Sequence, residues 1–106
     1  MATGRLGHAD LAAGAYTSIY TVPANTFAIV SVNMVNRGYS AITIRIATTT
    51  GATPLDSEFL EHDVELLSKG VMERTGIALS AGQILVVYSS AVSVSAVCFG
   101  IETATV

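Results

Sequence analysis

The sequence predicts an all-β protein, a single-domain antiparallel β-sandwich of seven to eight short strands. Three observations predict this fold class. Val, Ile and Thr dominate the chain, and these residues fit a pleated, half-buried surface. Apolar and polar residues alternate in several segments, as in strands with one buried face. Turn signals separate the segments at the spacing of a sandwich or barrel, and no segment has the pattern of a helix of about ten residues or more.

A chain of 106 residues is one domain by length. A domain of this size buries roughly two thirds of its unfolded surface, so its core needs neither a disulfide nor a metal. Residues 1–15 are rich in Gly and Ala. We therefore expect an N-terminal arm or loop over residues 1–15 and the sandwich domain over residues 16–106.

Three strands are predicted in the first half of this domain. Residues 16–22 form the first and end at Pro23. Residues 26–37 form a long second strand, which ends in a turn containing Gly38. Residues 41–47 form the third and have the clearest alternation in the chain. The inward positions of the last two strands are Ala28, Val30, Val32, Met34, Ile42, Ile44 and Ile46.

The second half is less regular. A loop follows over residues 48–56, with a short helical turn possible after Pro54, and a strand is expected from about Glu58 to Leu66. A short strand at 71–75 precedes a bent crossing segment at 76–82, which contains two glycines. Residues 84–88 are apolar throughout and are expected to be covered on both faces. The last strand spans residues 92–102.

The composition predicts a subunit whose surface is partly covered by neighbours. Hydrophobic residues make up 51% of the chain and charged residues 12%, against about 25% charged in an average domain. A membrane protein and a monomer solvated by Ser and Thr are the competing explanations. Three segments have apolar residues on both faces, whereas the core of a single sandwich buries only one face of each strand. The second apolar face needs another cover, such as a neighbouring subunit. We therefore predict an interface formed by Phe27, Ile29, Val35, Val97, Phe99 and Ile101.

The sequence argues against membrane and nucleic-acid partners. No stretch approaches the roughly 20 apolar residues of a spanning helix. The net charge is −3, and the five basic residues are scattered rather than gathered in a patch. The N-terminus has no apolar segment of a secretory signal, so we expect synthesis in a cytoplasm.

Catalytic and metal-binding patterns are also missing from the sequence. The candidate zinc ligands His8, His62 and Cys98 lie far apart, with no CxxC or HxxxH spacing. There is no Gly-x-Ser-x-Gly motif and no phosphate-binding glycine loop. The single Cys98 excludes an internal disulfide and is expected to be a small buried hydrophobe rather than a reactive thiol. We expect no enzyme activity, no metal and no cofactor.

The densest charges are acidic and lie around one predicted strand. Glu61, Asp63 and Glu65 alternate with His62, so they form one outward row about 7 Å apart, most simply a solvated face. A carboxylate pair for glycoside hydrolysis and a calcium site are the alternatives. His62 shares its face with Leu60 and is expected in the core or an interface rather than as a base.

Five segments together resemble a group of short structural proteins of tailed bacteriophages, including phages of cyanobacteria. They are MATGRLG (1–7), IYTVPA (19–24), VNMVNRG (32–38), VMERTGI (71–77) and FGIE (99–102). The resemblance covers nearly the whole chain, and its motifs are turn-and-strand signatures rather than catalytic ones. It implies a virion component with a β-sandwich or jelly-roll fold. Capsid cement or decoration proteins and tail appendages both fit this description.

We therefore expect a capsid cement or decoration protein located in the virion. It would form a homo-oligomer, with a trimer favoured, and would dock on the major capsid protein. A jelly-roll and an immunoglobulin-like strand order both remain open. The alternative is a tail or fibre module that binds a host receptor or glycan through loops and exposed tyrosines, among Tyr16, Tyr20, Tyr39 and Tyr88. A small enzyme with a carboxylate site is the third hypothesis.

Overall fold

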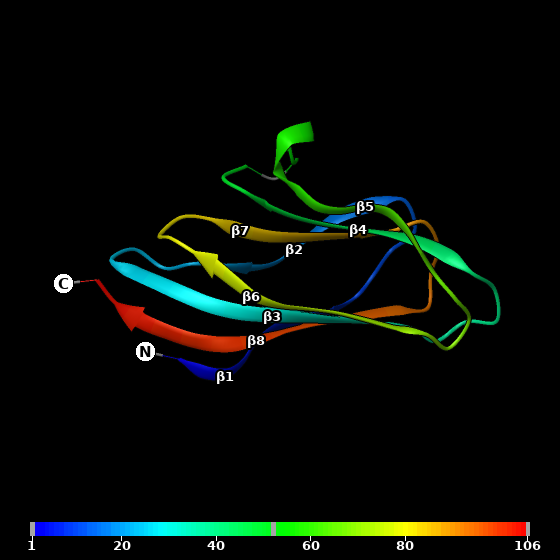
Figure 1. Ribbon diagram of the computed structural model, residues 1–106, viewed down its shortest axis with the longest axis horizontal. Coiled ribbons are helices and arrows are strands. Elements are labelled where there is room, and N and C mark those ends of the chain that lie inside the picture. The colour runs from blue at the N-terminus through cyan, green and yellow to red at the C-terminus, as the bar shows by residue number, and fades with distance from the viewer. Residues whose placement is uncertain (1, 52, 106) are drawn as a thin grey trace.

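A computed structural model of the chain describes residues 2–51 and 53–105. It confirms the all-β sandwich: two four-stranded antiparallel sheets pack against each other (Figure 1). Sheet A contains, in order, β1 (Thr3–Asp10), β8 (Val94–Ala104), β3 (Thr26–Asn36) and β6 (Val71–Leu79). Sheet B contains β2 (Ala15–Thr21), β7 (Ile84–Ser89), β4 (Ile42–Thr49) and β5 (Phe59–Leu66), and a short 3-10 turn, η1 (Asp56–Glu58), precedes β5.

The strand order is that of a jelly roll. The chain pairs like one long hairpin folded across two layers: β1 pairs with β8, β2 with β7, β3 with β6, and β4 with β5. The ladders β3–β8 and β4–β7 join these pairs into the two sheets. An eight-stranded double sheet with this order is a jelly roll, whereas an immunoglobulin domain arranges its strands differently. The pairing therefore decides between the two topologies that the sequence left open.

Much of the segment predicted as an N-terminal arm or loop, residues 1–15, belongs to the sandwich. Thr3–Asp10 form β1 at the edge of sheet A, and Leu11 after it is 3% exposed and part of the core. The pairing of β1 with β8 shifts register between Arg5 and Gly7, and Gly4 has a φ of 109°. A bulge of this kind interrupts the two-residue period, so the strand shows no regular alternation in the sequence.

The segment after Thr75 is a continuation of β6 and not the predicted crossing segment. β6 runs from Val71 to Leu79, and its register against β3 shifts between the pairs Val30–Ile77 and Val32–Arg74. Gly76 lies within this shift and has a φ of 70°, which glycine adopts without strain. The bulge explains why the alternation of this strand looked broken.

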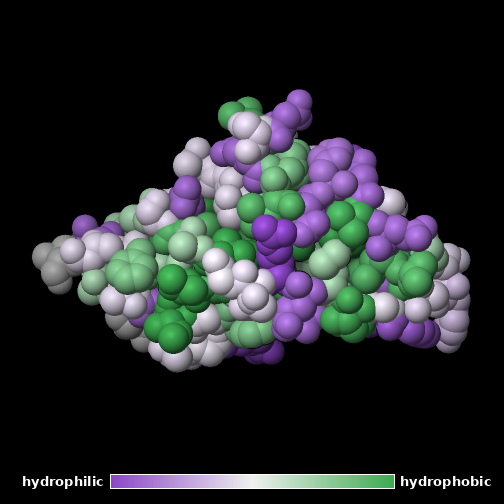
Figure 2. All heavy atoms as spheres, in the orientation of Figure 1, coloured by the Kyte–Doolittle hydropathy of each residue, from purple (hydrophilic) through white to green (hydrophobic). Residues whose placement is uncertain are grey.

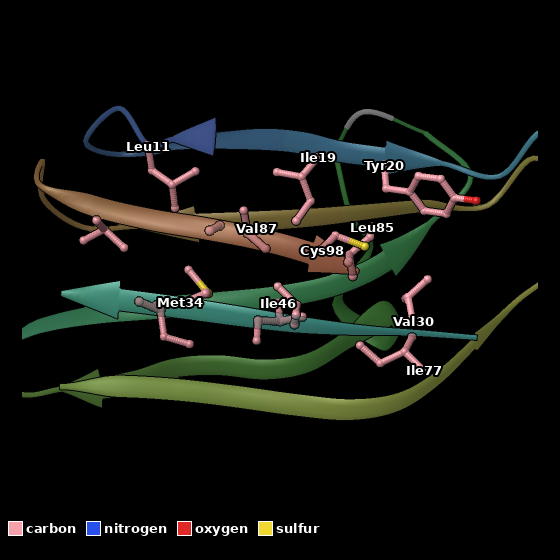
Figure 3. Packing of buried hydrophobic residues seen from close by; sticks show 14 of the residues in the cluster. Leu11, Ile19, Tyr20, Val30, Met34, Ile46, Ile77, Leu85, Val87 and Cys98 are labelled. Atoms are coloured by element: carbon pink, nitrogen blue, oxygen red, sulfur yellow. The ribbon is translucent and has the colours of Figure 1, made fainter. Parts of the chain in front are cut away.

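The core lies between the sheets and is made of the predicted alternating positions. Met34, Ile44, Ile46 and Leu85 are fully buried there, and Figure 3 shows such side chains from both sheets meeting between the layers. Cys98 is one of them, and its burial raises the pKa of the thiol to about 11. The prediction that Cys98 is a small buried hydrophobe is therefore confirmed.

Strand β7 is covered on both faces, as predicted, but by its own chain. Val87 faces the core, whereas Val86 faces outward and is still only 1% exposed. Ala47, the partner of Val86 on β4, is also buried outside the core cluster. On this outer side of sheet B lies η1, which contacts β4 (Figure 1). Pro54 is buried in this segment.

One side of the sandwich is closed by a close approach of β1 to β2. Both strands have register shifts there, at Gly7 in β1 and between Ser18 and Tyr20 in β2. A Cβ atom on Gly7 would lie 1.8 Å from the carbonyl oxygen of Ile19. Nearby, the Tyr20 hydroxyl donates to Glu102 Oε2 at 2.5 Å and joins the two sheets.

Replacing Gly7 by Ala should destabilise the fold, because the added methyl group overlaps the backbone of β2. Overpacking of this kind costs about 2 to 3 kcal/mol, which lowers the melting temperature by roughly 10 to 20 °C. Gly51→Ala is the matched control, since a Cβ there meets no atom within 4 Å. Thermal unfolding of both variants checks this, and equal melting temperatures would contradict the close approach.

The contact between Tyr20 and Glu102 should make stability depend on pH. Hydrogen bonds from the Tyr20 hydroxyl and the Ala2 N–H lower the pKa of Glu102 in the folded state. This contribution is present above the unfolded pKa and is lost as the pH falls through the folded pKa. Glu102→Gln should therefore lose stability relative to the wild type at neutral pH, and the difference should shrink in acid. Denaturant titrations of both proteins from neutral to acidic pH measure this difference in stability. A difference that does not change with pH would contradict the proposed role of the Glu102 carboxylate.

Candidate functional site

The six predicted interface residues lie together on the outer face of sheet A. Phe27, Ile29 and Val35 come from β3, and Val97, Phe99 and Ile101 from the neighbouring β8. We call this set the apolar face. Four of its members keep large exposed fractions: Phe27 39%, Ile29 48%, Phe99 36% and Ile101 55%.

Strand alternation and register produce the apolar face. The even-numbered residues of β3, such as Val30, point into the core, so its odd-numbered residues point outward. In the β3–β8 ladder Ile29 lies directly opposite Ile101, and Ser31 lies opposite Phe99. Apolar residues opposite each other on one sheet face form a contiguous surface.

Polar residues border the apolar face. On β1, Arg5 lies opposite Phe99 and His8 lies opposite Val97. On β6, Glu73 lies opposite Asn33, which itself interrupts the apolar residues of β3. An apolar centre with a charged border is the usual arrangement of a protein–protein interface.

The size of the apolar face suits a weak contact. Nine residues along β3 and two strands across span roughly 27 Å by 10 Å, or on the order of 300 Å². A stable complex buries about 800 Å² on each partner. Exposed apolar patches of roughly 300 to 600 Å² are the largest found on typical monomers and are often functional.

The outer face of sheet B carries a different surface, made of aromatic and charged side chains. Arg45 donates to both carboxylate oxygens of Asp63, at 2.6 and 3.2 Å, and to the Tyr16 hydroxyl at 2.7 Å. Its guanidinium carbon lies 4.5 Å from the centre of the Tyr88 ring, which itself packs against Tyr16. The hydrogen bonds from Arg45 hold the pKa of Asp63 below its usual range.

A bulge in β5 corrects the predicted row of acids. The register against β4 jumps from Val64–Ile44 to Glu61–Ile46, so two residues, His62 and Asp63, stand opposite Arg45 alone. Glu61 therefore does not share a row with Asp63 and instead pairs with Arg74 of sheet A at 2.5 Å.

The same bulge exposes His62, whose side chain is 51% accessible. Of the two predicted positions for His62, the core is therefore wrong, and the interface stays a prediction. Asp63 has a φ of 52°, a left-handed conformation. Such bulges re-aim side chains and are common beside functional sites.

A hollow of about 320 Å³ lies next to this bulge and is lined by Asp56, Phe59 and His62. The rings of Phe59 and His62 meet edge to face with centroids 4.7 Å apart, and His62 Nδ1 lies 3.6 Å from Asp63 Oδ2. The sequence analysis did not select Asp56 or Phe59, because only folding of η1 and β5 brings them beside His62.

The candidate zinc ligands lie in three different layers. His8 is on β1, which pairs with the edge of the apolar face, Cys98 is in the core, and His62 is outside sheet B. Among residues 2–51 and 53–105, no three His, Cys, Asp or Glu side chains gather as a metal site. Within the same residues, no helix is long and apolar enough to cross a membrane.

The tyrosines fall into separate environments. Tyr20 is buried at the closed side of the sandwich, whereas Tyr39 is 89% exposed in the turn after β3, with Lys69 Nζ 4.2 Å from its ring centre. Tyr16 and Tyr88 belong to the outer face of sheet B.

Comparison with protein-family models, curated proteins and solved structures finds no match to this chain.

Proposed function

We propose that this protein is a structural component of a phage virion, a capsid cement or decoration protein that oligomerises and docks on the major capsid protein. The observation that carries the proposal is the apolar face. Phe27, Ile29, Phe99 and Ile101 are large, adjacent and exposed on a regular sheet face. Covering them with a neighbouring subunit removes apolar surface from water.

The two outer faces of the sandwich differ in how far they are covered, which supports assembly through sheet A alone. Outside sheet B, Ala47 and Val86 are already buried by the chain itself. Outside sheet A, no described segment covers Ile29 or Ile101. A face of this size holds a partner weakly, but repetition over a capsid lattice sums many weak contacts into firm attachment.

A second candidate function is a tail or fibre module that binds a host receptor or glycan. The observation in its favour is the aromatic and charged surface of sheet B, where Tyr16, Tyr88 and Phe59 lie near the hollow beside His62. A virion protein that uses sheet A for assembly leaves this surface for contact with other molecules.

Polar residues at the centre of the apolar face should abolish self-association. The double substitution Ile29→Thr and Ile101→Thr keeps β-branched side chains, which suit strands. It removes apolar surface at two positions that are paired on adjacent strands. Light scattering at high protein concentration should give an oligomer for the wild type, with a trimer favoured, and a monomer for the double variant. The melting temperature of the monomer should change little, because both positions are about half exposed.

Leu67→Thr is the matched control. Leu67 is 62% exposed but lies in the turn after β5, away from the apolar face, so this variant should stay oligomeric. A wild-type protein that is monomeric at high concentration would refute self-association through this face. Docking is tested separately by co-sedimentation with capsids assembled without the protein: the wild type should pellet and the double variant should not.

A further inference from the structure

We infer that the hollow lined by Asp56, Phe59 and His62 is a saccharide-binding site that takes a neutral or amino sugar. This site lies on sheet B, on the opposite layer from the apolar face. The inference rests on the second candidate function and names the class of glycan for that surface, and it is independent of self-association through the apolar face.

The volume and the lining of the hollow suit a sugar ring. Its volume of about 320 Å³ is at the lower end of the range of small-molecule sites. Phe59 supplies an apolar wall and is itself only partly exposed, with its ring fixed by His62 at 4.7 Å and Tyr16 at 6.2 Å. The C–H face of a pyranose ring packs against such a wall, because aromatic rings present a flat apolar surface.

The polar groups around Phe59 suit hydroxyl ligands. The Asp56 carboxylate is exposed beside the ring, and an ionised carboxylate accepts hydrogen bonds from two hydroxyl groups. His62 lies on the same wall, with its Nδ1 beside Asp63 Oδ2 at 3.6 Å. The ring of His62 packs edge to face on Phe59, and its exposed side chain can offer a ring nitrogen to a ligand hydroxyl. A carboxylate, an imidazole and an aromatic wall thus meet around one hollow.

The support for this wall is built into the fold. The bulge in β5 and the left-handed Asp63 place His62 beside Phe59, and Arg45 fixes Asp63 through two hydrogen bonds. Arg45 is in turn held by the Tyr16 hydroxyl. Sites whose side chains are held by a second layer of contacts lose less freedom when a ligand binds.

The local charge selects the class of sugar. Asp56 and Glu58 are acidic, and the nearby Arg45 is already paired with Asp63. An acidic sugar would meet these carboxylates with no unpaired arginine to compensate, whereas a neutral or amino sugar would not. Sialic acid should therefore be rejected.

To test this inference, sugars are titrated into the isotope-labelled full chain while its amide NMR signals are recorded. The probes are N-acetylglucosamine, galactose, mannose, glucosamine and sialic acid, each added to tens of millimolar. At least one of the first four should shift the signals of Phe59 and His62, and sialic acid should not. Asp56→Asn should weaken binding about tenfold or more while leaving the melting temperature unchanged, because Asp56 is exposed.

Tyr39→Ala is the matched control, since it removes an exposed aromatic ring away from the hollow, and it should bind like the wild type. His62→Gln provides a second variant and should also weaken binding. The inference is overturned if no probe shifts these signals, if sialic acid binds as well as the others, or if Asp56→Asn binds normally. The variant with Ile29→Thr and Ile101→Thr should lose self-association but retain sugar binding. A failure of sugar binding can therefore be told apart from a failure of self-association.

Discussion

A sandwich of two sheets buries one face of each sheet and leaves two outer faces, and this constraint organises the whole molecule. In a chain that is 51% hydrophobic, both outer faces carry apolar residues. The chain covers the first itself: the segment through Pro54 and η1 lies outside sheet B, where Val86 and Ala47 are buried. The second, outside sheet A, keeps Ile29 and Ile101 in contact with solvent. The proposed self-association follows from this difference, because only sheet A needs an external cover.

The two faces also differ in chemistry, which allows them different roles. The apolar face is a regular pair of strands with opposing aliphatic and aromatic residues, a surface suited to another protein. Sheet B instead holds a charged network around Arg45 and an irregular strand that opens a hollow beside Phe59. The proposed assembly contact and the proposed ligand site thus lie on opposite outer faces of the sandwich.

The sequence predicted the regular strands well, but it misplaced residues at three of the register shifts. The alternation in β3 and β4 correctly placed Val30 and Ile44 in the core, and the alternation in β3 and β8 gathered the six outward residues on one face. β1, the second half of β6 and the acids of β5 were misplaced for one reason, since each contains a register shift that breaks the two-residue period. Phe59 and Asp56 were missed because their proximity to His62 depends on the path of the chain between β4 and β5.

The central claim is that the apolar face, and not the outer face of sheet B, makes contact with a neighbouring copy. Methyl NMR of the wild type over a wide concentration range tests it at the level of single residues. The account predicts that the methyl signals of Ile29 and Ile101 shift progressively as the concentration rises, while those of Val86 and Leu85 stay unchanged. Shifts confined to residues of sheet B, or constant Ile29 and Ile101 signals while the mass increases, would contradict it.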